Sequence, residues 1–283
     1  MSLNILPETV VYILHATIIA DCDGIFQFRT GYVAPNRGHQ YNECIKQTGK
    51  GANMIGIIGA MDIEVERFRD VMDASEVISI SGIDFYRGTI GNSQVVVAKC
   101  GIGKVFAAIC AEAMIIHFNP QVIINTGAAG GLSPDLNIAD IAVATGVVQH
   151  DMDTSPLGDP VGLISGINKV VIPADQYYGD KLTAAARELG LHCVRGIIAS
   201  GDTFVATNQQ RSRIRDSFEA IACEMEGAAV GQVCYVNNVP FVILRSISDS
   251  SSDSATMEYP EFVKIAANNS FAVIQKMLSE KEV

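Results

Sequence analysis

The chain alternates between short apolar runs and longer segments whose apolar residues recur every three or four positions. Short β-branched runs bounded by glycine or polar residues are typical of buried strands, and the longer spacing is typical of helices. Strands are predicted at residues 54–60, 77–80, 85–90, 94–99, 121–126, 138–148, 194–199 and 239–244. Helices are predicted at residues 61–71, 105–118, 175–189, 208–218, 227–236 and 258–278. Strands that alternate with helices in this way predict an α/β fold.

The composition fits an α/β protein with a buried sheet and argues against some partners. Of the 283 residues, 48% are hydrophobic, and the formal net charge is -11. Nucleic acids and anionic membrane surfaces attract basic patches, so this charge argues against both. The seven cysteines include no Cys-x-x-Cys pair and indicate reduced thiols in an intracellular, cytoplasmic protein.

Residues 1–53 differ from the rest of the chain. Their four basic and four acidic side chains balance, so the whole negative charge lies downstream. The apolar run at residues 9–20 has the length of a signal-peptide core, but it lacks a basic leader and is too short to span a bilayer. Residues 30–52 indicate a linker. We therefore expect an N-terminal extension, poorly ordered or packed on the surface, before a domain at residues 54–283, with secretion as the alternative.

Two carboxylates flank Met225 at the junction between an apolar run and a run of small residues that opens a helix. Buried carboxylates are costly unless a partner offsets their charge, so Glu224 and Glu226 indicate a ligand-binding site. The alternative is an exposed helix start, where acids interact favourably with the helix dipole. The spacing alone leaves both interpretations open.

Other candidate residues follow the predicted strands, and in α/β proteins ligand sites form at the carboxyl ends of strands. They are the acids Asp62, Glu64 and Glu66, the small residues 127–131, and residues 200–205 and 248–249. The small residues either let a ligand approach the backbone and its N–H groups closely or form only a tight turn, and the sequence leaves both interpretations open.

Two further motifs give weaker signals. Residues 101–104, Gly-Ile-Gly-Lys, look like a phosphate loop, but Ala98 and Val105 stand where such a loop needs a glycine and a hydroxyl residue. Residues 150–153, His-Asp-Met-Asp, offer metal ligands without an evident third ligand elsewhere, so a polar loop or interface is favoured. The glycine- and proline-rich residues 154–174 predict a loop that covers a pocket or reaches a partner.

Together these loops resemble the nucleoside phosphorylase/nucleosidase superfamily, and within it the family of 5′-methylthioadenosine/S-adenosylhomocysteine nucleosidases. The motifs are Gly-Ala-Met-x-x-Glu, Gly-Ile-Gly-Lys, Thr-Gly-x-Ala-Gly-Gly, Ser-Gly-Asp-x-Phe, Glu-Met-Glu and Ser-Asp, and their joint occurrence is specific. The likeness runs from Met54 to about Leu278 and leaves out residues 1–53. It implies that residues 54–283 form one catalytic domain, a three-layer α/β/α structure with a central twisted mixed sheet flanked by helices.

The resemblance also implies roles for individual residues. Glu64 would activate the attacking water, Asp249 would help to protonate adenine at N7, and Glu226 would accept hydrogen bonds from the ribose hydroxyls. Further substrate contacts would come from Met225, Phe204, Val205, Ala129, Gly130, Met61, Ile102 and Tyr259, and supporting contacts from Glu224, Arg245 and Ser248. No metal or cofactor is implied.

The chemistry of glycosidic bond cleavage independently explains why two carboxyl groups are needed. Cleavage of the C1′–N9 bond builds positive charge on the sugar and negative charge on adenine, so an acid at N7 and a base beside the water both help. Asp249 must then be protonated and Glu64 ionised when the reaction begins. The implied reaction is hydrolysis of 5′-methylthioadenosine, S-adenosylhomocysteine and related 5′-substituted adenosines, in methionine salvage and recycling of S-adenosylmethionine by-products.

Two alternatives use the same scaffold. A phosphorylase needs cationic side chains to hold phosphate, whereas residues 59–64 supply acids and no Arg or Lys, so hydrolysis is favoured. A non-catalytic nucleoside-binding protein would need neither Glu64 nor Asp249.

The resemblance further implies a homodimer in which a neighbouring subunit lends an aromatic side chain to the 5′ pocket. The matching loop of this chain offers Leu157 and no nearby aromatic. Ala128 stands where the family often has serine, and Tyr259 stands where phenylalanine is common. The preference between methylthio and homocysteinyl substituents therefore stays open.

Overall fold

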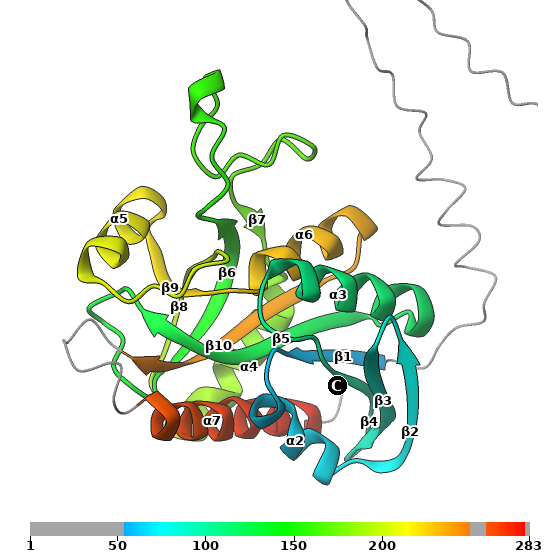
Figure 1. Ribbon diagram of the computed structural model, residues 1–283. Coiled ribbons are helices and arrows are strands. Elements are labelled where there is room, and N and C mark those ends of the chain that lie inside the picture. Colours follow the sequence, from blue (N-terminus) through cyan, green and yellow to red (C-terminus); the bar gives the residue numbers. More distant parts are fainter. Residues whose placement is uncertain (1–53, 250–258, 281–283) are drawn as a thin grey trace, which may run out of the picture. The chain divides into compact units, whose positions relative to one another are not determined.

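The computed structural model describes residues 54–249 and 259–280, so the predictions about residues 1–53 lie outside the described residues (Figure 1). The strands form one ten-stranded sheet: β1 (Met54–Gly59), β2 (Asp73–Ile80), β3 (Ile83–Ile90), β4 (Ser93–Lys99), β5 (Val122–Gly131), β6 (Ile141–Gln149), β7 (Ile172–Pro173), β8 (Cys193–Ser200), β9 (Ala220–Glu224) and β10 (Phe241–Asp249). The helices are α2 (Asp62–Asp70), α3 (Lys104–Phe118), α4 (Gln176–Glu188), α5 (Asn208–Phe218), α6 (Gly227–Asn237) and α7 (Tyr259–Ser279), with a short 3-10 turn η1 (Ser155–Leu157).

The sheet is mixed, as predicted. Strand β1 lies in the middle of one half and runs parallel to both β4 and β5. Strands β2, β3 and β4 form an antiparallel meander. Its two turns contain Gly82 and Gly91, whose φ angles of 76° and 58° lie in the left-handed region that glycine tolerates.

Five strands close into a ring. Strand β5 pairs with β10, β10 with β6, β6 with β8, β8 with β9, and β9 returns to β5. The ring brings the carboxyl ends of several strands to one place, since Ser200 pairs with Glu224, and Gly130 pairs with both Cys223 and Asp249. A site built from strand ends can therefore form at this edge of the sheet.

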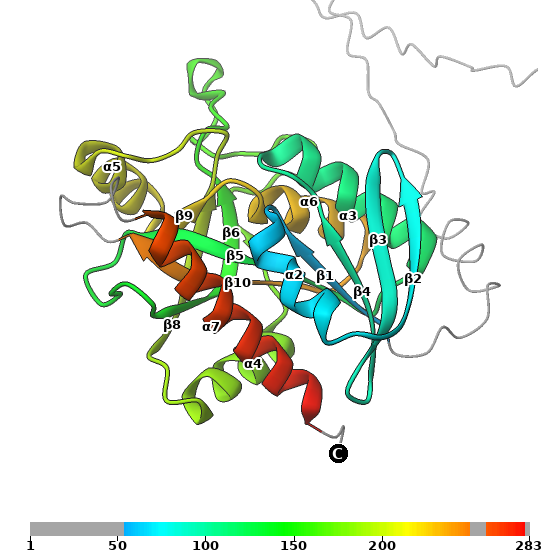
Figure 2. The same ribbon diagram turned by 60° about the horizontal axis from the view of Figure 1, so that its bottom comes forward.

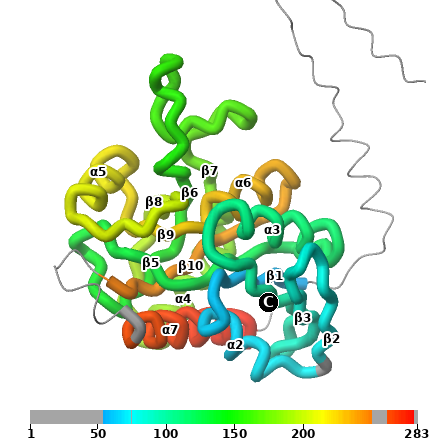
Figure 3. The backbone as a smooth tube through the Cα atoms, in the orientation of Figure 1, coloured from blue at the N-terminus to red at the C-terminus, as the bar shows by residue number. Residues whose placement is uncertain are grey.

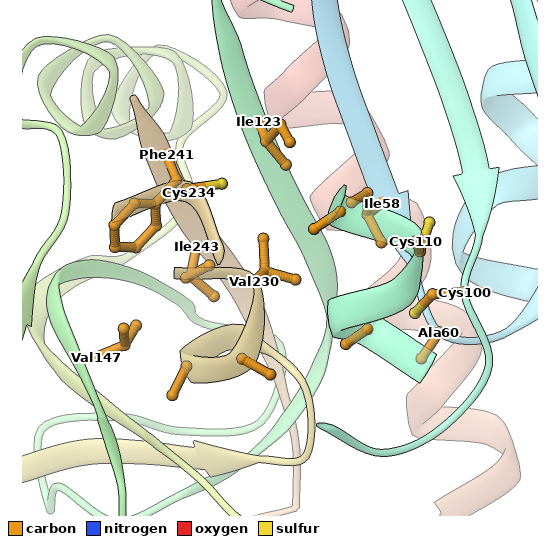
Figure 4. Packing of buried hydrophobic residues seen from close by; sticks show 14 of the residues in the cluster. Ile58, Ala60, Cys100, Cys110, Ile123, Val147, Val230, Cys234, Phe241 and Ile243 are labelled. Atoms are coloured by element: carbon orange, nitrogen blue, oxygen red, sulfur yellow. The ribbon is translucent and has the colours of Figure 1, made fainter. Parts of the chain in front are cut away.

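Helices cover both faces of the sheet, which confirms the predicted three-layer architecture. Helices α2, α4 and α7 share one buried cluster, in which Phe68 packs on Phe271 with ring centroids 4.9 Å apart (Figure 2). Helices α3 and α6 cover the opposite face, where Val230 of α6 lies with Ile58 and Ile243 of the sheet (Figure 4). Burial of these apolar side chains supplies the main stabilising free energy of the fold.

Two expectations about strand ends were wrong. Residues 127–131 do not form a tight turn, because β5 continues to Gly131 and pairs there with β9 and β10. Strand β10 likewise continues beyond Leu244 to Asp249. The candidate residues at both places therefore lie on strands, which hold side chains more rigidly than loops do.

The segment between β6 and β7 projects from the rest of the described chain (Figure 3). Its turn η1 presents Leu157 with 84% of its surface exposed. In the part of the chain that is described, no helix is long and apolar enough to cross a membrane.

Candidate active site

A pocket opens at the edge of the sheet where the strand ends meet. It is lined by Ala60, Met61, Glu64, Ile102, Ala128, Ala129, Gly130, Thr203, Phe204, Val205, Cys223, Glu224, Met225, Glu226, Ser248 and Asp249. The structure thus brings together all the predicted site residues except Arg245, which lies behind the pocket wall, and Tyr259, whose side chain is outside the described part.

Glu64 lies in the first turn of α2, just after the carboxyl end of β1. Its carboxylate accepts hydrogen bonds from the backbone N–H groups of Ala60 at 2.8 Å, Met61 at 3.0 Å and Ala128 at 3.0 Å. Burial raises the pKa of Glu64, while the charge of Arg245 and the three backbone donors oppose that rise. A fixed carboxylate with a raised pKa is a stronger base than an exposed glutamate, which suits the removal of a proton from water.

The backbone of β5 passes close to Glu64 because it carries no side chain there. A Cβ atom on Gly127 would lie 2.5 Å from Oε1 of Glu64. Three residues further along β5, a Cβ on Gly130 would lie 3.4 Å from Oδ2 of Asp249. The small residues of β5 therefore make room for both carboxyl groups, although they do so as a strand.

Asp249 forms a buried ion pair that the sequence did not indicate. Its Oδ2 lies 2.6 Å from Nη2 of Arg211 on α5, and both side chains are less than 10% exposed. The hydroxyl of Ser248 donates to Oδ1 of Asp249 at 3.0 Å. The sequence did not indicate Arg211 because it lies in a mostly polar helix, and its pairing with a residue 38 positions away leaves no local pattern.

The two glutamates flanking Met225 are both buried, so the exposed helix start is excluded. Glu224 is 8% exposed and Glu226 is 6% exposed. Glu224 accepts hydrogen bonds from Ser200, from Arg245 and from the backbone N–H groups of Glu226 at 3.0 Å and Gly227 at 2.7 Å. Its hydrogen-bonding capacity is taken up inside the protein, which gives it a supporting position.

Glu226, in contrast, keeps one face toward the pocket. Its Oε1 accepts from the backbone N–H of Gly103 at 2.8 Å, and its Oε2 lies 4.0 Å from Arg245. Burial and the charge of Glu224 raise the pKa of Glu226 to about 7, although Arg245 opposes the rise. Glu226 therefore has acceptor capacity left for a ligand.

Arg245 supplies the positive charge that offsets the buried carboxylates of Glu224 and Glu226. It is 1% exposed and also donates to Oδ1 of Asn125 at 2.5 Å. Removing one member of a buried ion pair leaves an uncompensated charge. We expect Arg245→Met to lower the free energy of unfolding by about 3–5 kcal/mol in urea titrations.

The matched control is Arg215→Met, which removes an exposed pair with Asp216 and should cost less than about 1 kcal/mol. Equal stability of the two variants would contradict the assignment of Arg245 as the central buried cation.

The mouth of the pocket is apolar and open. Phe204 is 52% exposed and Ile102 is 57% exposed, although both line the pocket.

Cys223 also lines the pocket, but burial raises the pKa of its thiol to about 12, so it stays protonated near neutral pH.

Residues 150–153 supply an ion pair, as expected of a polar loop. Asp151 lies 2.6 Å from the ammonium group of Lys104. Among the residues that the structure describes, no group of three or more His, Cys, Asp or Glu side chains is arranged to hold a metal ion.

Comparison with known proteins places this pocket in a family. The model of the phosphorylase superfamily matches residues 54–279. The chain belongs to the phosphorylase superfamily. Within this superfamily, it is similar to solved 5′-methylthioadenosine/S-adenosylhomocysteine nucleosidases, which confirms the resemblance inferred from the motifs.

Three solved structures illustrate the similarity. The nucleosidase from Neisseria meningitidis, in complex with methylthio-immucillin-A, is 34% identical, with a TM-score of 0.77 over 80% of this chain and 99% of its own. A variant nucleosidase from Helicobacter pylori, with 5′-methylthioadenosine in its active site, is 35% identical, with a TM-score of 0.77 over 81% of this chain and 100% of its own. A futalosine hydrolase from Helicobacter pylori is 34% identical, with a TM-score of 0.77 over 81% of this chain and 99% of its own.

The superfamily member described here has pocket residues to which the sequence analysis assigned no contact with the substrate. Ala60, Ala128, Thr203 and Cys223 line the pocket beside the predicted ones. Ala60, Ala128 and Thr203 lie inside motifs that had been recognised, so the motif positions could have indicated them. Cys223 directly precedes Glu224 and looks like a core residue, because thiols are commonly buried.

Proposed function

We propose that this superfamily member hydrolyses the N-glycosidic bond of 5′-methylthioadenosine, S-adenosylhomocysteine and related 5′-substituted adenosines. The products are adenine and the 5-thioribose compound, as methionine salvage and the recycling of S-adenosylmethionine by-products require. The observation that carries the proposal is the placement of two buried carboxyl groups at separate points of one pocket. The carboxylate of Glu64 lies against Gly127 and Ala128 of β5, and the carboxylate of Asp249 lies against Gly130 of the same strand.

This spacing suits an acid and a base on either side of a glycosidic bond. Two to three residues of extended strand span about 7–10 Å. A ribose–purine bond with a water molecule beside the sugar fits between groups so separated. Glu64 would take a proton from the water as it attacks C1′, and Asp249 would donate a proton to N7 as the bond to N9 breaks.

The other residues would bind and orient the substrate. Glu226, with acceptor capacity facing the pocket, would accept hydrogen bonds from both ribose hydroxyls. Met225 and Phe204 would pack on the ribose and purine, and the backbone of Val205 would meet adenine. Ala129 and Gly130 would lie along the purine, and Met61 and Ile102 would border the 5′-thio end, where Tyr259 is also proposed to lie.

The ion pair of Asp249 adds a step to this mechanism. Pairing with Arg211 suits an ionised Asp249, whereas donation to N7 needs a proton on it. We therefore expect the pair to loosen when adenine enters, so that Asp249 takes up a proton from solvent and turns toward N7. Ser248 keeps its hydrogen bond to the other oxygen and would limit that movement to a rotation.

A phosphorylase is disfavoured by the charge of the pocket. None of the described lining residues is a lysine or an arginine. Arg211 and Arg245 lie behind the lining, and each is already paired with a carboxylate. A phosphate ion beside Glu64 would meet a negative charge with no free cation to offset it.

The substrate range is tested by the release of free base from a panel of nucleosides. We expect adenine from 5′-methylthioadenosine and S-adenosylhomocysteine, and no hypoxanthine from inosine. The similarity to a futalosine hydrolase makes futalosine the informative fourth member of the panel. Release from futalosine alone would replace the proposed substrate, and release from none of the four would contradict the proposal.

The pKa of Glu226 predicts how substrate affinity varies with pH. Only the carboxylate can accept from both hydroxyls, and its pKa is about 7 before substrate binds. Below that pH a proton must be lost on binding, so the KM for 5′-methylthioadenosine should fall up to about tenfold per unit as pH rises toward 7, and then level off. Initial rates at several pH values measure this. Glu226→Gln should weaken binding and flatten the profile, and a flat wild-type profile would contradict the assignment.

We also propose a cytoplasmic homodimer. The start of α3 presents Ile102, Val105 and Phe106 with more than half of each side chain exposed, beside a pocket mouth that is itself apolar. A second subunit would cover this surface and narrow the mouth. The described cysteines are free thiols, which suits a reducing compartment. A monomer in sedimentation equilibrium would contradict the dimer.

A further inference from the structure

Lys104 ties together three loops around the pocket. Its ammonium group donates to Oδ1 of Asp151 at 2.6 Å and to Oε1 of Gln149 at 3.0 Å. The other oxygen of Asp151 accepts from the backbone N–H of Asp202 at 2.9 Å. Asp202 in turn accepts, through Oδ1, from the backbone N–H of Lys104 at 2.8 Å. Lys104, Asp151 and Asp202 thus form a closed circuit of hydrogen bonds.

The ion pair of Lys104 with Asp151 is partly shielded from solvent, whereas the third member of the circuit, Asp202, is exposed. The side chain of Lys104 is 17% exposed and that of Asp151 is 27% exposed. The pair between Lys276 and Glu188 has a similar length of 2.7 Å, but its side chains are 37% and 55% exposed. A shielded pair loses less of its interaction energy to water, so the circuit can hold its loops in place.

The loop that Lys104 anchors also orients Glu226. Gly103, the preceding residue, donates its N–H to Oε1 of Glu226 at 2.8 Å. Gly103 has a φ of +100°, and a Cβ there would lie 3.1 Å from Oδ1 of Asp202. The direction of this N–H therefore depends on a loop conformation that the circuit fixes at the next residue, Lys104.

We propose that Lys104 is a positioning residue for recognition of the ribose hydroxyls. By holding the Gly103 N–H against Oε1 of Glu226, it aims the remaining acceptor sites of that carboxylate into the pocket. The lysine of the Gly-Ile-Gly-Lys motif thus binds no phosphate, and it acts through Glu226 without touching the substrate. This inference rests on the proposed function, since it requires a ribose diol in the pocket.

The test compares Lys104→Met with the matched control Lys276→Met on two ligands. One is 5′-methylthioadenosine, assayed as KM and kcat. The other is its 2′,3′-dideoxy analogue, assayed as a competitive inhibitor, because it lacks only the hydroxyls that Glu226 would bind. In Lys104→Met we expect the KM to rise about tenfold, the effect of weakening a charge-assisted hydrogen bond, with a smaller change in kcat. The inhibition constant of the analogue should change by less than about twofold, since that bond is absent from its complex.

The possible outcomes distinguish failure of this inference from failure of the proposed function. An unchanged KM in Lys104→Met, as expected for Lys276→Met, would overturn the inference. An equal loss of affinity for both ligands would also overturn it, because it would mean a general loosening of the pocket. If wild-type protein releases no adenine, or binds both ligands equally well, the proposed function or its diol clamp fails instead.

Discussion

Replacing Glu64 with glutamine is expected to lower kcat for adenine release from 5′-methylthioadenosine by about 10²–10⁴-fold, the usual contribution of a general base. Glutamine has the same shape, so the carbonyl oxygen of its amide can still accept from Ala60 and Met61. Its amide nitrogen, however, would face the N–H of Ala128, which donates to Oε1 in this structure. The variant therefore loses the base and gains an unfavourable donor–donor contact.

The matched control is Glu66→Gln on the same helix. Glu66 is exposed, so its replacement should leave kcat unchanged. Thermal melts of both variants show whether either one is unfolded. A folded Glu64→Gln variant with kcat within about tenfold of wild type would contradict the role of Glu64 as the base.

Replacing Asp249 with asparagine is the second substitution with a large expected effect, again about 10²–10⁴-fold on kcat. An amide cannot donate the proton that N7 needs. Arg211 would also lose its carboxylate while remaining buried, so some loss of stability should accompany the loss of activity. Melting curves measured beside the rates separate the two effects.

A change of leaving group makes this prediction sharper. With a 4-nitrophenyl 5-methylthioriboside, the leaving group departs without protonation, so an acid contributes little. Asp249→Asn should then recover most of its rate relative to wild type, whereas Glu64→Gln should stay slow, since water must still be activated. Equal losses on both substrates in Asp249→Asn would contradict the role of Asp249 as the acid. Asp216→Asn, which alters an exposed aspartate, is the control.

Eight of the ten strands in the described residues, the helices and most pocket residues could be predicted because their signals are local, whereas the short strands β7 and β9 were not predicted. Apolar periodicity located the strands and helices, and the acids at strand ends marked the pocket. Glu64 and Asp249 were named from short motifs, and the structure places both in the pocket wall. Their catalytic roles remain predictions that the substitutions above test.

Of the two interpretations of the glycine-rich end of β5, the tight turn was wrong, and the reason is physical. Glycine weakens a strand, so a run of small residues ordinarily indicates a turn. Here the absence of a side chain on Gly127 leaves space for the carboxyl group of Glu64 from α2. Gly130 in the same way leaves space for the carboxyl group of Asp249 from β10. Only the assembled sheet shows why small residues occupy a strand at this place.

The charge pairs behind the pocket could not be predicted at all. Arg211 with Asp249, and Lys104 with Asp151, join residues far apart in sequence. Asp249, Lys104 and Asp151 each lie in a motif noted above, but no local pattern in the sequence indicates which charge each of them pairs with. The short contact of β9 with β5, which closes the ring and brings these loops together, likewise has no local signal.

The central claim is that water, and not phosphate, attacks the sugar in the pocket of Glu64 and Asp249. The most direct measurement is product analysis of 5′-methylthioadenosine cleavage in buffers with and without phosphate. We predict the same rate of adenine release in both buffers, with free 5-methylthioribose as the second product. A requirement for phosphate, with 5-methylthioribose 1-phosphate as the product, would contradict the account.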